Sequence, residues 1–141
     1  MKPARSANPA RGGFTLIELS VVIFILIALL SMGFGMSKAI DTWKKAKEAS
    51  ETLRSVYTAQ RLYLADHPTT ALSTLTPTLV APYIPNGNGT TVPTATSLTN
   101  STLYARVNVS PPYWTTAAGG TTGSAYDPSG SATDSLWDVG Q

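Results

Sequence analysis

The sequence contains no cysteine, and this absence excludes several classes of protein. A chain without cysteine forms no disulfide, carries no lipid on a cysteine anchor and builds no thiolate metal site. Its 141 residues allow one modest domain with an appendage. Any folded part must therefore be held together by packing alone, with a small core.

Charged side chains are also few, at 13% of the residues, and they are unevenly distributed. The first 13 residues contain three basic side chains, Lys2, Arg5 and Arg11, and no acidic one. The formal net charge of +2 would become −1 without this segment. This balance gives no reason to expect a nucleic acid as partner.

Signatures of catalysis are missing as well. The sequence has one histidine, His67, and lacks the GxSxG, HExxH, P-loop and dinucleotide-binding patterns. Serine and threonine are abundant, but a hydroxyl group needs a positioned base to act as a nucleophile. We interpret His67 as a residue at the end of a helix, and we expect neither an enzyme nor a cofactor.

A long apolar segment is the most prominent feature that is present. Residues 14–36 read FTLIELSVVIFILIALLSMGFGM, and as a helix they would span about 34 Å. This length is enough to cross a hydrocarbon core of about 30 Å. The basic residues of the leader then place Met1 in the cytoplasm and the chain beyond Lys38 outside.

Glu18 is the exception within the apolar segment. A carboxylate inside hydrocarbon costs roughly 3 kcal/mol unless it is compensated, so it is a candidate for a functional role. It follows Phe14 by four residues, which is one helical turn on the same face. A cut between Gly13 and Phe14 would create an amine at the start of the helix. Between two chains staggered by about one turn, this amine could neutralise Glu18 and set the register of assembly.

The sequence Gly13-Phe14-Thr15-Leu16-Ile17-Glu18, followed by the apolar run, resembles a known motif. The known motif is the prepilin cleavage and methylation motif, which belongs to type IV pilins and to the pseudopilins of type II secretion and competence systems. The resemblance covers about the first 25 residues. It implies that a prepilin peptidase cuts after Gly13, that Phe14 becomes the N-methylated first residue, and that Glu18 guides assembly. Implied partners are identical and related subunits in a helical filament and an inner-membrane assembly platform.

Two other interpretations of the segment stay open. One is a conventional signal peptide cut near Ser31-Met32-Gly33, although the apolar region of such a peptide should not contain an acid. The other is a plain uncleaved anchor, which leaves Glu18 unexplained. We expect a bacterial inner-membrane protein with a single span and its head in the periplasm or exterior. The assembled filament would be periplasmic or on the surface.

Helical periodicity continues beyond the apolar segment. Apolar and neutral residues recur every three or four positions: Ile40, Trp43, Ala46, Ala49, Leu53, Val56, Gln60 and Tyr63. Pro68 should end the helix, because the residue before proline avoids the α region. We predict one helix from Phe14 to about Asp66. We interpret the stripe as the surface on which a head packs; a coiled-coil partner is the alternative.

The remaining residues are rich in Thr, Ser, Gly and Pro. Thr76-Pro77 predicts an N-cap followed by proline at the first position of a short helix. Residues 102–109 alternate between apolar and polar side chains, which predicts a half-buried strand. Tyr113 and Trp114 should begin another strand or cover the sheet edge, and residues 117–133 should be largely loop.

The predicted fold class is therefore α+β and pilin-like, with one long N-terminal helix and a small antiparallel β-sheet head. The membrane-spanning first half of the helix precedes a second half on which the sheet packs. We divide the chain into a basic prepilin leader, a transmembrane or filament-core helix, a soluble continuation of that helix and a Thr/Ser/Gly-rich β head. These are residues 1–13, 14–36, 37–67 and 68–141.

Three carboxylates near the end of the chain are candidates for calcium ligands: Asp127, Asp134 and Asp138. The segment loosely resembles the carboxyl-terminal loop that binds calcium in major pseudopilins of type II secretion. Its spacing is not that of an EF-hand, and solvated acids are common in polar loops. We therefore expect no metal site, with these three residues as the candidates if there is one.

The leading functional hypothesis is a structural subunit of a type IV pilus-like filament. The compact, cysteine-free head favours a pseudopilin of a type II secretion system, with a type IV pilin or a competence pseudopilin as alternatives. A hypothesis of a different class is a monomeric membrane-anchored binding module. Its ligand would bind an aromatic platform made by Tyr104, Tyr113 and Trp114.

Overall fold

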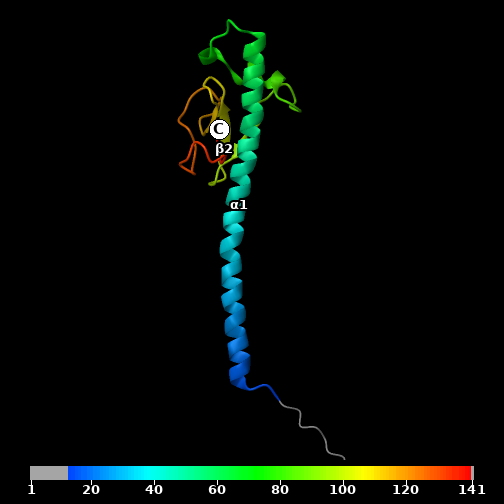
Figure 1. Cartoon of the computed structure of the whole chain (residues 1–141), viewed down its shortest axis with the longest axis vertical. Coiled ribbons are helices and arrows are strands. Elements are labelled where there is room, and N and C mark those ends of the chain that lie inside the picture. The colour runs from blue at the N-terminus through cyan, green and yellow to red at the C-terminus, as the bar shows by residue number, and fades with distance from the viewer. Residues whose placement is uncertain (1–12, 141) are drawn as a thin grey trace, which may run out of the picture. The chain divides into compact units, whose positions relative to one another are not determined.

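The computed structural model describes residues 13–140, without the side chains of residues 34–36. The elements in chain order are α1 (Leu16–Asp66), η1 (Leu72–Thr74), α2 (Pro77–Val80), η2 (Ala81–Tyr83), β1 (Ala95–Thr96), β2 (Thr102–Arg106) and β3 (Tyr113–Thr115) (Figure 1). One long helix and a small three-stranded antiparallel sheet confirm the predicted α+β, pilin-like class. The chain divides into two compact units, one ending at Lys38 and one beginning at Ala39.

Helix α1 is 51 residues long and has nearly the predicted bounds. It begins at Leu16, directly after Thr15, and ends at Asp66, two residues before Pro68. Residues with good helix propensity fill its second half, and glycines lie only at positions 33 and 35. From Ala39 onward, the predicted soluble continuation belongs to the same compact unit as the head.

The first half of α1 has no core of its own. Its large apolar side chains from Phe14 to Met32 are exposed, and the helix is long and apolar enough to cross a membrane. Two serines within this half satisfy their hydroxyl groups locally. Ser20 Oγ donates to the carbonyl of Ile17 at 2.9 Å, and Ser31 Oγ donates to that of Ile27 at 2.8 Å. Hydrocarbon would therefore be a suitable solvent for this surface.

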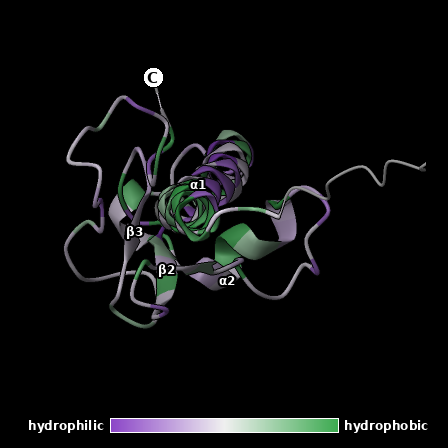
Figure 2. Cartoon of the chain, turned by 90° about the horizontal axis from the view of Figure 1, so that it is seen from below, coloured by the Kyte–Doolittle hydropathy of each residue, from purple (hydrophilic) through white to green (hydrophobic). Residues whose placement is uncertain are grey.

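The second half of α1 supplies one wall of the head's core. Ala46, Ala49, Leu53 and Val56 are buried on one face, and the stripe continues through buried Ala59, Gln60 and Tyr63. In Figure 2 the elements α2, β2 and β3 lie around the helix. The predicted packing stripe is therefore confirmed from Ala46 onward.

The first two members of that stripe do not join the core. Ile40 is 47% exposed and Trp43 is 55% exposed. Our prediction that they pack under the head was wrong. A period of three to four residues identifies the face of the helix that packs, but not the residue along the helix at which the head begins.

The sheet has the order β1-β2-β3 with both pairs antiparallel. Ala95 lies opposite Leu103, and Ala105 lies opposite Trp114. Leu103, Ala105 and Trp114 are buried, so one face of the sheet packs on the core as the alternation predicted. β3 begins at Tyr113, as expected, whereas the short edge strand β1 was not predicted.

Strand β2 ends at Arg106, three residues earlier than predicted. The register would next pair Val107 with Pro112, which has no N–H to donate to the ladder. Gln60 instead bonds to the carbonyl groups that follow. Its Nε2 donates to the carbonyl oxygens of Val107 and Val109, both at 2.7 Å. Gln60 is completely buried. This amide thus replaces a strand partner and ties the end of the sheet to α1.

The end of the chain folds back onto α1. Arg54 Nε donates to the carbonyl of Val139 at 2.7 Å, and its Nη2 donates to Ser135 Oγ at 2.8 Å. Trp137 is 3% exposed, and its ring meets that of Tyr126 edge-on at 5.3 Å. Trp137 therefore anchors the tail in the core, as a side chain of this size would be expected to do.

We predict that the Gln60 amide stabilises the head. Gln60→Met keeps a similar volume but leaves the carbonyls of Val107 and Val109 without their donor. We expect the free energy of unfolding of the full chain in detergent to fall by about 1–3 kcal/mol, the usual cost of unpaired buried polar groups. Denaturant titration followed by tryptophan fluorescence measures this change. The control is Arg61→Gln at the neighbouring exposed position; equal stability of both variants would contradict the prediction.

A second prediction concerns pH. Burial raises the pKa of Asp138 above its ordinary value of 3.8, and the nearby carboxylates of Asp134 and Asp127 add to this shift. The native state then binds this proton more tightly than the unfolded chain, so stability rises as the pH falls through the window above 3.8. At pH 7 the charged form costs stability, and Asp138→Asn should therefore raise the free energy of unfolding.

The same Asp138→Asn gain should disappear at a pH of about 3, where the wild-type carboxyl is protonated in both states. Denaturant titrations of the wild type and the variant at both pH values measure it. Asp41→Asn removes an exposed carboxylate on α1 and controls for the loss of one negative charge. A gain of the same size at both pH values would show that the buried charge is not its cause.

Candidate functional site

The peptide bond between Gly13 and Phe14 lies in an accessible segment. Residues 13–15 precede α1 and are not helical. Phe14 is 89% exposed, and the space around the Gly13 α-carbon is open. A peptidase could therefore reach this bond without unfolding α1. The basic leader that we predicted, residues 1–13, lies outside the described residues except for Gly13.

Thr15 and Glu18 form a reciprocal cap at the start of α1. Glu18 Oε2 accepts hydrogen bonds from the backbone nitrogen and from Oγ1 of Thr15, both at 3.0 Å. In return, the backbone nitrogen of Glu18 donates to Thr15 Oγ1 at 3.3 Å. This is the capping-box arrangement of threonine followed three residues later by glutamate. The start of the helix is thereby satisfied within one chain.

The capping box shows how the Glu18 carboxylate is positioned. Among the described residues, the recorded bonds to this carboxylate come from Thr15 and converge on Oε2. Its other oxygen is thus available to a group from outside the chain. We predicted a role for Glu18 but overlooked Thr15, although the Thr-x-x-Glu spacing that marks a capping box is visible in the sequence.

A shallow apolar hollow lies beside Glu18 on the surface of α1. Five further residues line it: Phe14, Ile17, Leu19, Val21 and Val22. The carboxylate therefore lies at the edge of an apolar surface. Such a surface suits another apolar helix or lipid, and it brings any positive partner of Glu18 into a low dielectric.

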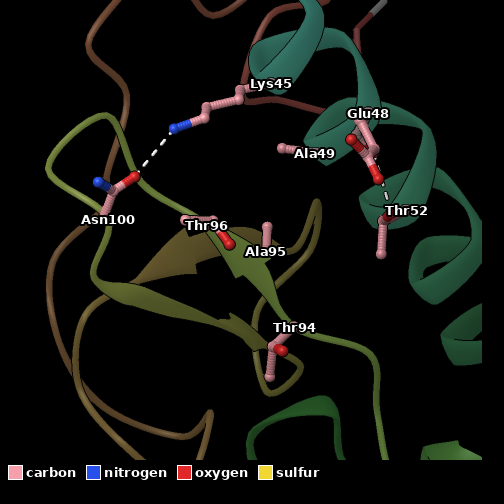
Figure 3. Close-up of a pocket in the computed structure, with 8 residues that line it drawn as sticks. All are labelled: Lys45, Glu48, Ala49, Thr52, Thr94, Ala95, Thr96 and Asn100. Carbon is pink, nitrogen blue, oxygen red and sulfur yellow. Dashed lines mark hydrogen bonds between the residues drawn. The ribbon is translucent and has the colours of Figure 1, made fainter.

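A polar hollow lies between the second half of α1 and the edge strand β1 (Figure 3). Lys45 Nζ donates to Asn100 Oδ1 across it at 2.9 Å. The other lining residues are Glu48, Ala49, Thr52, Thr94, Ala95 and Thr96. The lining hydroxyl groups have no histidine beside them, because His67 is not among these residues. Besides the threonine hydroxyl groups, the lining offers the carboxylate of Glu48 and the engaged ammonium group of Lys45.

His67 lies directly after the end of α1, where we placed it. Its ring stacks on that of Tyr63 at 4.4 Å, and its Nδ1 lies 3.1 Å from the carbonyl oxygen of the same residue. These contacts finish the last turn of the helix. His67 therefore has a local structural use.

The three calcium candidates each close a turn of their own backbone. Oδ1 of Asp127 accepts from the nitrogen of Ser129, that of Asp134 from Leu136, and that of Asp138 from Gly140, at 3.0, 2.9 and 2.8 Å. Among residues 13–140 no group of three or more His, Cys, Asp or Glu side chains could hold a metal ion. The structure thus gives these acids a role in turns.

The three aromatic residues of the predicted platform do not form an open surface. Trp114 is completely buried, and its Nε1 donates to the carbonyl of Ala49 at 3.2 Å. The hydroxyl of half-buried Tyr113 accepts a bond from Arg106 and donates to the carbonyl of Gly123. Tyr104 is half-buried on the other side of β2 from Leu103 and Ala105. Trp114, the largest of the three side chains, is therefore not available to a ligand on the surface.

Comparison with known proteins agrees with the geometry at the start of α1. Residues 8–34 match a family model described as the prokaryotic N-terminal methylation motif. No match was found among curated proteins or among solved structures. The matched range contains the accessible Gly13–Phe14 bond, the capping box and the apolar half of α1. The chain thus carries the prokaryotic N-terminal methylation motif, which is the signature of type IV pilins and pseudopilins.

Proposed function

We propose that this chain is a structural subunit of a type IV pilus-like filament, with no enzymatic activity of its own. One observation carries the proposal. A single carboxylate, Glu18, is held by Thr15 at the start of an exposed apolar helix, one turn from an accessible bond that lies inside the matched motif. A plain membrane anchor needs none of these features.

Processing would generate a positively charged partner for Glu18. Hydrolysis of the Gly13–Phe14 bond by a prepilin peptidase adds water across it, so that Gly13 leaves with a carboxylate and Phe14 gains an ammonium group. Methylation of that nitrogen keeps its positive charge. The new amine then lies at the end of an apolar helix, where an unpaired charge is as costly as that of Glu18.

Pairing between neighbouring subunits would remove both costs. Within one chain Thr15 holds Oε2 of Glu18, and the second carboxylate oxygen is available for the Phe14 amine of an adjoining subunit. Breaking such a buried pair costs several kcal/mol, roughly 3–5, so subunits that are out of register are disfavoured. The apolar hollow beside Glu18 gives the neighbouring helix a surface on which to pack.

Within this class we propose a pseudopilin of a type II secretion system, assembled on an inner-membrane platform. The supporting observation is the small head, which has three short strands and no cysteine. A type IV pilin and a competence pseudopilin are the nearest alternatives. The buried position of Trp114 speaks against the monomeric binding module, because that function needed an exposed aromatic platform.

The first prediction of the proposed function concerns the mature amino terminus. Mass spectrometry of the membrane-associated protein should show a chain that begins at Phe14 and carries one methyl group on its nitrogen. Expression without a prepilin peptidase is the control and should give the full chain. A mature protein that retains its leader, or that begins beyond Met32, would contradict the proposal.

The second prediction separates the charge of Glu18 from its capping role. Glu18→Gln preserves the cap, since glutamine also serves at this position of a capping box, but removes the negative charge. We expect this variant to be inserted and cleaved normally and to give at least tenfold fewer sheared filaments, because a pairing of more than about 1.4 kcal/mol is lost.

Thr15→Val is the matched control, because it removes the cap and keeps the charge. We expect Thr15→Val to retain filaments at a reduced yield. Amino-terminal mass spectrometry of both variants shows whether cleavage is unchanged. Filaments of normal yield from Glu18→Gln would exclude the charge pairing.

A further inference from the structure

A second apolar feature of α1 is not explained by the head or by the matched motif. Ile40, Trp43, Lys44 and Lys47 share one face of the helix, since each lies three or four residues from two of the others. We call these four residues the Trp43 face. The buried stripe of Ala46, Ala49, Leu53 and Val56 lies on the opposite side.

The head leaves the Trp43 face open. Trp43 is 55% exposed and Ile40 is 47% exposed, whereas Trp114 and Trp137 are both buried. Lys44 is exposed and Lys47 half-exposed. Lys45, by contrast, points toward the head, where it donates to Asn100 (Figure 3). Lys44 and Lys47 are thus the lysines of this region that accompany Trp43.

The position of this face along α1 can be counted in residues. Glu18 and Lys38 bracket a stretch of 19 residues without a charged side chain. At 1.5 Å per residue this stretch is about 28 Å long, close to the thickness of a hydrocarbon core. Trp43 follows Lys38 by five residues, which is roughly 7–8 Å further along the helix. This is about the depth of a headgroup layer, which adds roughly 5–8 Å on each side of the core.

The charge of the region complements acidic lipids. Four lysines and one aspartate, Asp41, lie between residues 38 and 47. Glu48 follows directly, but it lines the polar hollow on the side of the head. Glu51 lies on the same side as the Trp43 face but one turn beyond Lys47, further from the apolar stretch. Tryptophan is the side chain that concentrates at membrane interfaces, and lysine reaches lipid phosphates while its stem covers apolar surface.

We propose that the Trp43 face binds the headgroups of acidic phospholipids at the outer surface of the membrane that α1 spans. This proposal rests on the membrane-spanning role of α1 in the proposed function, but not on assembly. Ile40 and the Trp43 ring enter the headgroup layer, and Lys44 and Lys47 contact lipid phosphates. The binding fixes the depth of α1 and the side of the helix that faces lipid while the subunit is a monomer in the membrane.

The test uses the full chain reconstituted at low density in phosphatidylcholine vesicles that contain phosphatidylglycerol. A lipid with a spin label on its headgroup should quench the fluorescence of Trp43, and Trp43→Phe should lose most of this quenching, because the other two tryptophans are buried. Phosphatidylglycerol labelled high on its acyl chain should quench Trp43 more strongly than labelled phosphatidylcholine. We expect an enrichment of at least about fivefold at low salt, since a single lysine at an acidic surface already gives an effect of this order and the face has two.

Matched variants assign the lipid preference to the two lysines. Lys44→Gln/Lys47→Gln should abolish the enrichment, and Lys44→Arg/Lys47→Arg should keep it. Arg61→Gln removes one exposed positive charge further along α1 and should also keep it. High salt should lower the enrichment for the wild type, because exposed charges are screened.

Each contrary outcome overturns a defined part of the proposal. Unquenched Trp43 in a chain that resists extraction by alkaline carbonate would exclude the lipid site and leave the proposed function intact. Equal quenching by the two labelled lipids would exclude the acidic headgroup. Quenching that falls as the protein density rises would assign the face to a second copy of the chain. A chain that carbonate extracts would contradict the membrane span itself, and with it both proposals.

Discussion

The head depends on one surface of α1 for its core. The three strands have only two, five and three residues, so the apolar face of the sheet is small and is buried by packing against α1. The small side chains of Ala46 and Ala49 let the sheet come close enough for Trp114 to donate to a carbonyl of the helix. Gln60 and Arg54 then tie the end of β2 and the tail of the chain to the same helix. In a cysteine-free chain, these contacts perform the role that disulfides have in many small exported domains.

The first half of the same helix solves a different problem. Its surface is apolar and exposed, and its serine hydroxyl groups are satisfied by its own carbonyls. Glu18 is the exception, since its carboxylate accepts hydrogen bonds from Thr15, a neutral partner that does not balance a negative charge. This charge marks one position along an otherwise apolar helix. In the proposed filament, it is what distinguishes one register of neighbouring helices from all others.

The lysines beyond the span bear on how α1 is oriented in a membrane. Three basic residues precede the apolar segment, but four lysines follow it between residues 38 and 47. A simple count of charges therefore does not favour one side. The orientation that we expected from the basic leader counted only the residues before the span, and in our proposal it depends on the processing motif instead. Lys45 is engaged by Asn100 in the head. The proposed contact with headgroups gives Lys44 and Lys47, two of the other three lysines, a use on the outer side.

The sequence by itself determined the features that depend on near neighbours. The motif at Gly13–Glu18, the end of α1 before Pro68 and the buried alternation of Leu103 and Ala105 are all written in spacings of a few residues. The tertiary structure decided what depends on residues far apart. Gln60 bonds to the carbonyl beyond the end of β2 over a separation of 47 residues, and β1 pairs with β2. It also decided that Ile40 and Trp43 lie outside the core and that Trp114 lies within it. Periodicity identifies the apolar face of an element, but only the packing of distant segments determines what covers that face.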